Sequence, residues 1–191
     1  MMERQLTYFV NCCVKRGYIE EEKAPWLEYA LQKRLVMIVV GIPFFVTGIW
    51  ISSFWQAIVF LTSFYFLRQR TSGAHCSNMY YCLACSLLLE ILFLGVLPEI
   101  ASRSLLDFLV LISAGIILRK APFPCPYLNM NTQELKACAI GSKVRICILL
   151  TAYLISHFFD EDDILRGIGC GIVMAAFLLA IAYINPKENK L

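Results

Sequence analysis

Six apolar blocks constrain the fold of this chain more than any other feature. The blocks are Leu35–Phe54, Trp55–Leu67, Met79–Val96, Leu105–Leu118, Ile146–Phe159 and Ile164–Ile184. They raise the hydrophobic share to 59% of the 191 residues, against about 45–50% in a typical soluble domain. Because hydrocarbon offers the backbone no hydrogen-bond partner, blocks of this kind cross a bilayer as helices. The sequence therefore predicts an all-α polytopic membrane protein, with residues 1–191 forming one integral membrane domain.

Two of the blocks are short, and the last one is rich in glycine. Trp55–Leu67 and Leu105–Leu118 fall short of the roughly 20 residues that a straight span needs. We expect each to be a short, tilted or partly re-entrant element. In the last block, alternate positions are held by Gly167, Gly169 and Gly171. Small residues of this kind let another helix approach closely.

Residues 1–24 are predicted to form an amphipathic N-terminal segment. Apolar residues recur at helical spacing at Leu6, Phe9, Val10 and Cys13, with charged residues on other faces. Two interpretations fit equally well, an interfacial helix lying on the membrane and an ordinary packing helix. The charges of this region leave no short apolar core, so we expect no cleavable signal peptide.

Lysine and arginine alternate between the two ends of the apolar blocks. The N-terminal region, the stretch after Leu67, the loop expected over residues 119–145 and the C-terminal tail hold 15 of the 17 basic residues. The turns between them hold only Arg103 and Arg166, and residues 157–163 are strongly acidic. Because cytoplasmic loops are enriched in Lys and Arg, both termini and the stretch after Leu67 are predicted to be cytoplasmic. The net charge of +3 is too small to imply nucleic acid as a partner.

The polar stretch over residues 68–82 holds the residues with the clearest chemistry. It contains His75, one of only two histidines, seven residues before Cys82. A cysteine attacks an acyl carbon as the thiolate, and a nearby histidine can take its proton. On one straight helix the two residues would be about 10.5 Å apart, beyond the roughly 3 Å of a hydrogen bond. The segment must therefore fold back at Gly73, with Ser77 or the asparagine after it capping the helix that carries Cys82.

Other interpretations of this pair stay open. Cys76 adjoins the histidine and Cys85 lies one helical turn beyond Cys82, so either is a rival nucleophile. Cys82 and Cys85 also form a Cys-x-x-Cys pair, but we expect no metal there, because zinc sites use this pair in a turn rather than in an apolar helix. A loop histidine and a packing cysteine would fit the pair as well, since free cysteine is often buried.

The neighbours of this pair resemble the accessory gene regulator protein B (AgrB) family, bacterial membrane peptidases that mature quorum-sensing propeptides. The family pattern is an arginine after an apolar aromatic helix, then Gly-x-His, then a cysteine seven residues later. The matching residues are Arg68, Gly73, His75 and Cys82. The resemblance is specific over residues 64–82 and extends to the size of the chain, its amphipathic start and a polar loop that opens with Ala121-Pro122.

The resemblance implies a cysteine endopeptidase with a His75–Cys82 dyad, peptide cyclase activity and no cofactor. Cys82 would attack a backbone carbonyl of a short AgrD-like propeptide, and an acidic C-terminal tail would leave. A Cys or Ser of the propeptide would then attack the Cys82 thioester and close a thiolactone or lactone. The expected substrate-binding residues are Arg68, Arg70 and Gly73, with Ser77 and Glu90 in support. The implied setting is the plasma membrane of a bacterium, with a homodimer as a further expectation.

Two acidic residues within apolar blocks define the main rival function. An acid inside a membrane segment is a functional candidate, so Glu90 and Asp107 also fit a small transporter or channel. A membrane scaffold or metal-binding protein is the second rival. For Glu90 we favour a structural pairing with a basic or hydroxyl group, and for Asp107 an interfacial position. His157 is interpreted as structural, because it adjoins the acidic turn.

Overall fold

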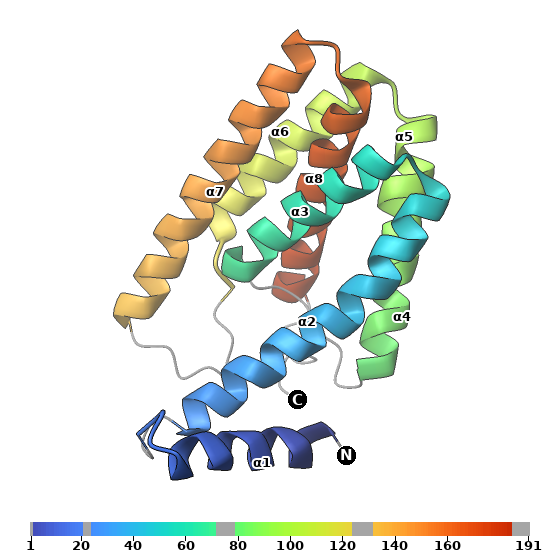
Figure 1. The fold of residues 1–191 in the computed structure, drawn as a ribbon. Helices are drawn as coiled ribbons and strands as arrows, with labels where there is room; N and C mark the ends of the chain where they lie inside the picture. Colours follow the sequence, from blue (N-terminus) through green and yellow to red (C-terminus); the bar gives the residue numbers. More distant parts are fainter. Residues whose placement is uncertain (1, 21–23, 72–78, 124–131, 185–191) are drawn as a thin grey trace. The chain divides into compact units, whose positions relative to one another are not determined.

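The computed structural model of the chain describes residues 2–20, 24–71, 79–123 and 132–184. Within these residues all regular structure is helical, and no strand is formed. The elements in order are α1 (Met2–Lys15), α2 (Ala24–Ile51), α3 (Phe54–Thr71), α4 (Met79–Glu90), the π-helix η2 (Ile91–Val96), α5 (Leu97–Ile100), α6 (Arg103–Lys120), α7 (Thr132–Phe158) and α8 (Asp162–Ile184). Figure 1 shows their arrangement.

The chain divides into two compact units, Met1–Pro43 and Phe44–Leu191. In the first unit α1 lies where the sequence predicts a helix, and the Thr7 hydroxyl donates to Glu28 Oε1 at the start of α2 (2.5 Å). The amphipathic character of residues 1–24 and an interfacial position stay predictions. Helix α2 continues through Pro43 into the second unit, which contains all the later helices.

Apart from Ser52, Ser53 and Phe159, every residue of the predicted apolar blocks is helical, and within the described residues three helical stretches are long and apolar enough to cross a membrane. They are Leu83–Ile100, Leu135–Phe158 and Asp162–Ile184. The end of α2, Gly41–Ile51, is a shorter apolar helix. Exposed apolar side chains along α6 and α7 also suit a lipid environment. These features support membrane association, whereas six complete crossings stay a prediction.

Two boundaries differ from the sequence prediction. Residues 132–145 were expected in a polar loop, but α7 begins at Thr132, so that expectation is wrong over this range. The reason is that Gln, Glu, Leu, Lys and Ala favour a helix regardless of their polarity. Helix α3 likewise extends past its apolar block through Arg68 and Arg70 to Thr71, and it reaches 18 residues.

Helix α8 lies at the centre of the second unit, where α3, α6 and α7 pack around it (Figure 1). Two thirds of its apolar stretch (67%) is buried, against 22% in each of the other two candidate spans. The close approach predicted from its glycines is confirmed. A Cβ atom at Gly167 would lie 2.8 Å from the Gln56 carbonyl oxygen, and one at Gly171 would lie 3.0 Å from Ser63 Cβ.

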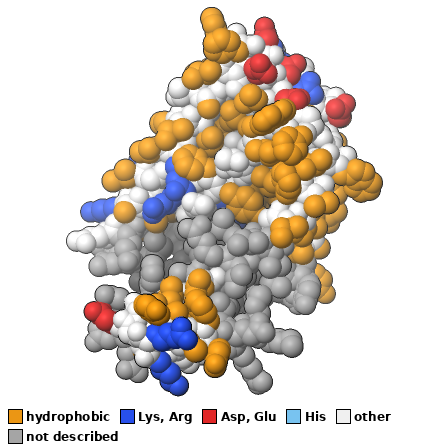
Figure 2. Space-filling view, viewed as in Figure 1, with side chains coloured by type: hydrophobic (Ala, Val, Ile, Leu, Met, Phe, Trp, Pro, Cys, Tyr) orange, Lys and Arg blue, Asp and Glu red, His pale blue; other side chains and the backbone are white. Residues whose placement is uncertain are grey.

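The turns of the second unit gather at two opposite ends. The acidic end comprises the turns after α2, α5 and α7, where Ser53 donates to Asp163 (2.7 Å) and Arg103 pairs with Asp160 (2.9 Å). Figure 2 shows Asp and Glu side chains gathered there. The basic end comprises the last turns of α3, α6 and α8 and the first turns of α4 and α7, where Tyr183 donates to the Lys120 carbonyl (2.7 Å). This grouping matches the charge alternation, while the orientation in a membrane stays a prediction.

Candidate functional site

The connection between α3 and α4 contains the predicted catalytic stretch. Residues 72–78, and with them Gly73, His75, Cys76 and Ser77, lie outside the described residues. Cys82 is the fourth residue of α4, and the structure describes its backbone. The distance between His75 and Cys82 is therefore not tested. The helix start at Met79 agrees with the expectation that Cys82 lies near a helix N-terminus.

The end of α3 is held firmly where the chain enters this connection. Thr71 is fully buried, and its carbonyl accepts a hydrogen bond from the backbone N–H of Phe123 (3.0 Å). Phe123 is itself buried and packs edge-on against Tyr183 of α8, with ring centroids 5.1 Å apart. The segment that follows α6 thus fixes the starting point of the catalytic stretch.

Arg70 crosses from α3 to α7. Its aliphatic stem lies over Gly141, where an added Cβ would lie 3.4 Å from Arg70 Cδ. Its Nη1 lies 3.7 Å from Cys138 Sγ, and the side chain is exposed. Arg68, two residues earlier, is half-buried on the same helix. The glycine in α7 therefore makes room for an arginine that remains available to solvent.

Arg145 is part of this region, although the sequence indicated only a contribution to membrane orientation. Its Nη1 donates to the Phe66 carbonyl (2.5 Å) and to Gln69 Oε1 (3.2 Å). Its guanidinium carbon lies 4.6 Å from the centre of the Phe66 ring, a cation–π geometry. Nothing in the sequence could identify these contacts, because α3 and α7 are far apart in the chain.

Two arginines at this end have no acidic partner among the described residues. Within the described ranges neither Arg70 nor Arg145 forms an ion pair, and their bonded partners are a thiol, a carbonyl and an amide. The two guanidinium groups are close enough to repel each other. An anionic ligand would relieve this repulsion.

The two acids in the predicted apolar blocks each have a local partner. Glu90 is fully buried, and its Oε2 lies 2.6 Å from the Thr47 hydroxyl, which supports the hydroxyl pairing favoured for it. Asp107 accepts a hydrogen bond from Tyr153 (2.7 Å) and lies 3.6 Å from His157 Nε2. Asp107 and His157 thus join α6 to α7 near the acidic end, away from the first turn of α4.

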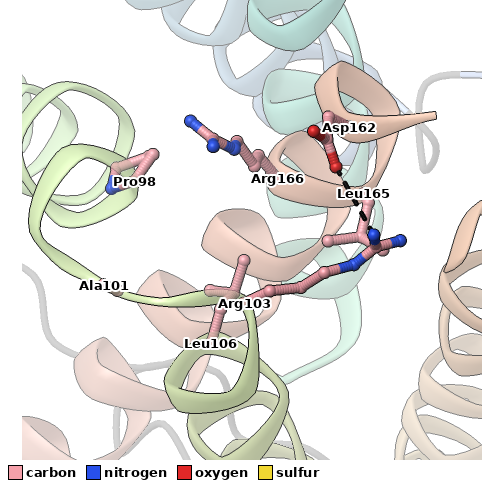
Figure 3. A pocket seen from close by; sticks show the side chains of 7 residues that line it. All are labelled: Pro98, Ala101, Arg103, Leu106, Asp162, Leu165 and Arg166. Carbon is pink, nitrogen blue, oxygen red and sulfur yellow. Dashed lines mark ion pairs between the residues drawn. The ribbon is translucent and has the colours of Figure 1, made fainter. Parts of the chain in front are cut away.

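A small cavity of about 110 Å³ also lies at the acidic end. Figure 3 shows Arg103 reaching toward Asp162 on one side of it, with Arg166 and Pro98 across from them. Sites for small molecules usually have about 300–1,000 Å³. This cavity is therefore too small for a peptide. The contact between Arg103 and Asp162 (4.0 Å) balances part of the charge of the side chains that line it.

These features define an all-helical protein with candidate membrane spans and a polar connection between two helices at its basic end. The sequence matches the Accessory gene regulator B (AgrB) family over residues 6–180. The chain belongs to this family, as the residues around His75 and Cys82 had indicated.

Two curated relatives are the accessory gene regulator protein B of Staphylococcus aureus strain MW2 and that of strain MRSA252. Each is 27% identical over 128 residues, which are 66% of this chain and 66% of the relative. The match thus spans just under two thirds of the length of these relatives. No solved structure matches the chain.

Proposed function

We propose that this protein is a membrane cysteine endopeptidase that removes the acidic C-terminal tail of a short quorum-sensing propeptide and promotes its cyclisation. The observation that carries the proposal is the Arg68, Gly73, His75 and Cys82 pattern in a chain that belongs to the AgrB family. The match over residues 6–180 includes all four residues.

The position of Cys82 on α4 suits a nucleophile. In the first turn of a helix the unpaired N–H groups and the helix dipole favour a thiolate. His75 takes the thiol proton, and Cys82 Sγ attacks the scissile carbonyl. The C–N bond breaks, and His75 returns the proton to the leaving amine. The product is a thioester on Cys82 and a free C-terminal tail.

The second step closes the ring. A Cys thiol or Ser hydroxyl of the bound propeptide attacks the thioester carbonyl, and Cys82 leaves as the thiol. Water must be kept away for cyclisation to compete with hydrolysis, and a site recessed at a membrane surface favours this. Residues 72–78 would contribute the base and the bend that bring His75 to Cys82.

Arg70 and Arg145 form no ion pair among the described residues, and this is a reason to expect an acidic tail in the propeptide. Arg70 and Arg145 keep their positive charge at the end where α4 begins. Arg68, which matches the family pattern, lies on the same helix as Arg70. The planar guanidinium group matches carboxylates in two-point contacts. A propeptide tail carrying Asp or Glu would therefore bind at the end of the protein where α4 begins.

The rival function as a transporter or channel finds less support. Glu90 is bonded to Thr47, and Asp107 to Tyr153 and His157. Each acid thus has a structural role that accounts for its presence. Glu90 links α4 to α2, and Asp107 links α6 to α7.

The enzyme is tested by co-expression with candidate propeptides from its genomic neighbourhood and mass spectrometry of the products. Cys82→Ala and His75→Ala should abolish both the cleaved tail and the ring, because each removes one member of the dyad. Cys85→Ala is the matched control, since Cys85 is an exposed thiol on the same helix, and it should keep full activity, as should Cys76→Ala. Cleavage by Cys82→Ala at the wild-type rate would refute the mechanism.

We also propose a multi-pass position in the bacterial plasma membrane with both termini and the catalytic stretch cytoplasmic. In intact cells, a membrane-impermeant thiol reagent should label Ser104→Cys, which is exposed at the acidic end, but not Ser72→Cys. Both substitutions are made in a chain whose other accessible cysteines are replaced. The reverse labelling pattern would invert the orientation.

A further inference from the structure

Glu90 is a buried acid for which the proposed mechanism has no direct use. Its side chain is fully buried at the end of α4, immediately before the π-helix η2. Its Oε1 is the one buried side-chain oxygen without a hydrogen-bond partner among the described residues. Burying an ionised carboxylate in this way is costly, so the group requires an explanation.

The number of protons available around Thr47 explains how Glu90 can be buried. The Thr47 hydroxyl oxygen lies 2.6 Å from Glu90 Oε2 and 3.1 Å from the Phe44 carbonyl oxygen. A threonine hydroxyl has a single proton to donate, so it can form only one linear hydrogen bond as the donor, to one oxygen or to the other. If Glu90 carries a proton on Oε2, Glu90 donates to Thr47 and Thr47 donates to Phe44. Both short contacts are then hydrogen bonds, and Oε1 becomes a neutral carbonyl oxygen.

The surroundings of Glu90 agree with a neutral acid. Within the described part of the chain Glu90 forms no ion pair. The titratable side chain that faces it from α3 is Tyr65, which is not a cation. Gly48, next to Thr47, brings α2 so close that an added Cβ would lie 3.1 Å from Glu90 Oε1 and 3.2 Å from Ala57 Cβ.

The contact between the end of α2 and Glu90 continues into η2. An added Cβ at Gly95, in the π-helix, would lie 3.6 Å from Ile51 Cδ1. One at Gly48 would lie 3.5 Å from Leu94 Cδ2. The last two turns of α2 therefore pack against η2 and against Glu90 at the end of α4, and the Glu90–Thr47 contact is the polar link in this seam. The helix that ends in this seam at Glu90 carries Cys82 in its first turn.

We propose that Glu90 is a protonated positioning residue, which donates to Thr47 and holds α4 against the end of α2 in the arrangement that cleavage requires. The part of this proposal that concerns cleavage rests on the proposed function. The protonation state does not depend on it.

The protonation state is tested on the wild-type protein in detergent by infrared spectroscopy. A protonated carboxyl has a C=O stretching band that an ionised carboxylate lacks, and the band shifts in heavy water. The wild type should show this band at neutral pH, Glu90→Gln should lose it, and Glu99→Gln should keep it. Glu99 is the matched control because it is an exposed acid of the following short helix. An unchanged spectrum in folded Glu90→Gln would overturn the protonated state.

The positioning role is tested by the rate of propeptide cleavage. Glu90→Gln should stay within about twofold of the wild type, because its amide also donates to Thr47. Thr47→Val should lower kcat by about tenfold or more with little change in KM, because a tilted nucleophile is costly to the chemical step, and Thr47→Ser should restore it. A folded but inactive Glu90→Gln would overturn the proposal, as would full activity of Thr47→Val. Cleavage by Cys82→Ala would instead refute the proposed function and leave the infrared result unaffected.

Discussion

The two ends of the second unit hold their arginines in different ways. At the acidic end Arg103 donates to Asp160 and to the His157 carbonyl, so its charge is balanced by acids. At the basic end Arg145 donates to a carbonyl and an amide, and Arg70 contacts a thiol. Both sets of contacts join neighbouring helices. Among the described residues Arg70 and Arg145 form no ion pair, which is why we assign substrate binding to the basic end.

Both ends belong to the second unit, so their difference can be tested only while its helices stay packed. We expect this packing to be most sensitive to a substitution at Gly167, where α8 meets α3. An added methyl group would lie 2.8 Å from the Gln56 carbonyl oxygen, so Gly167→Ala should destabilise the protein by about 1–3 kcal/mol and lower activity and stability together. Thermal unfolding in detergent measures this change. The control is Gly115→Ala in α6, where nothing lies within 4 Å. An equal loss of stability in both variants would contradict the packing of α8 against α3.

Charge reversal at the basic end should affect substrate binding. Arg70→Glu is expected to raise KM for an acidic-tail propeptide about tenfold, equivalent to ~1.4 kcal/mol, because repulsion replaces attraction at an exposed side chain. Steady-state cleavage kinetics measure the change. A propeptide whose tail acids are replaced by lysines should recover affinity for this variant. If Arg70→Glu leaves KM unchanged, the charge of Arg70 has no role in binding.

The smallest effect is expected at the acidic end. Arg103→Ala removes exposed ion pairs, which contribute about 0–1 kcal/mol, so the unfolding temperature should fall slightly and KM should stay the same. The same unfolding and kinetic assays provide both values. A large rise in KM for Arg103→Ala would show that the two ends do not differ in function.

Hydropathy predicted the helices well and their polar extensions poorly. The six apolar blocks are helical except at Ser52, Ser53 and Phe159, because a run of apolar residues indicates a buried or lipid-facing helix whatever its neighbours are. Residues 132–145 were missed because an exposed helix surface carries the same polar residues as a loop. The π-helix after Glu90 has no sequence signal that distinguishes it from an α-helix.

For the candidate site, the sequence predicted the motif residues but not the residues that pack around them. Four residues of the family pattern lie close together in the sequence, so the pattern identifies them without a structure. Arg145 and Thr47 act on partners 79 and 43 residues away, and only the packing of helices brings them there. The geometry of His75 and Cys82 lies outside the described residues and stays a prediction.

The most direct test of the central claim is to trap the acyl-enzyme. The purified protein is mixed with its propeptide, quenched in acid and analysed by peptide-mapping mass spectrometry. We expect the N-terminal part of the propeptide on Cys82, released by hydroxylamine as a thioester should be, and no adduct in Cys82→Ala. An adduct on Cys76 or Cys85, or cleavage with no adduct on Cys82 at any reaction time, would contradict the assignment of Cys82 as the nucleophile.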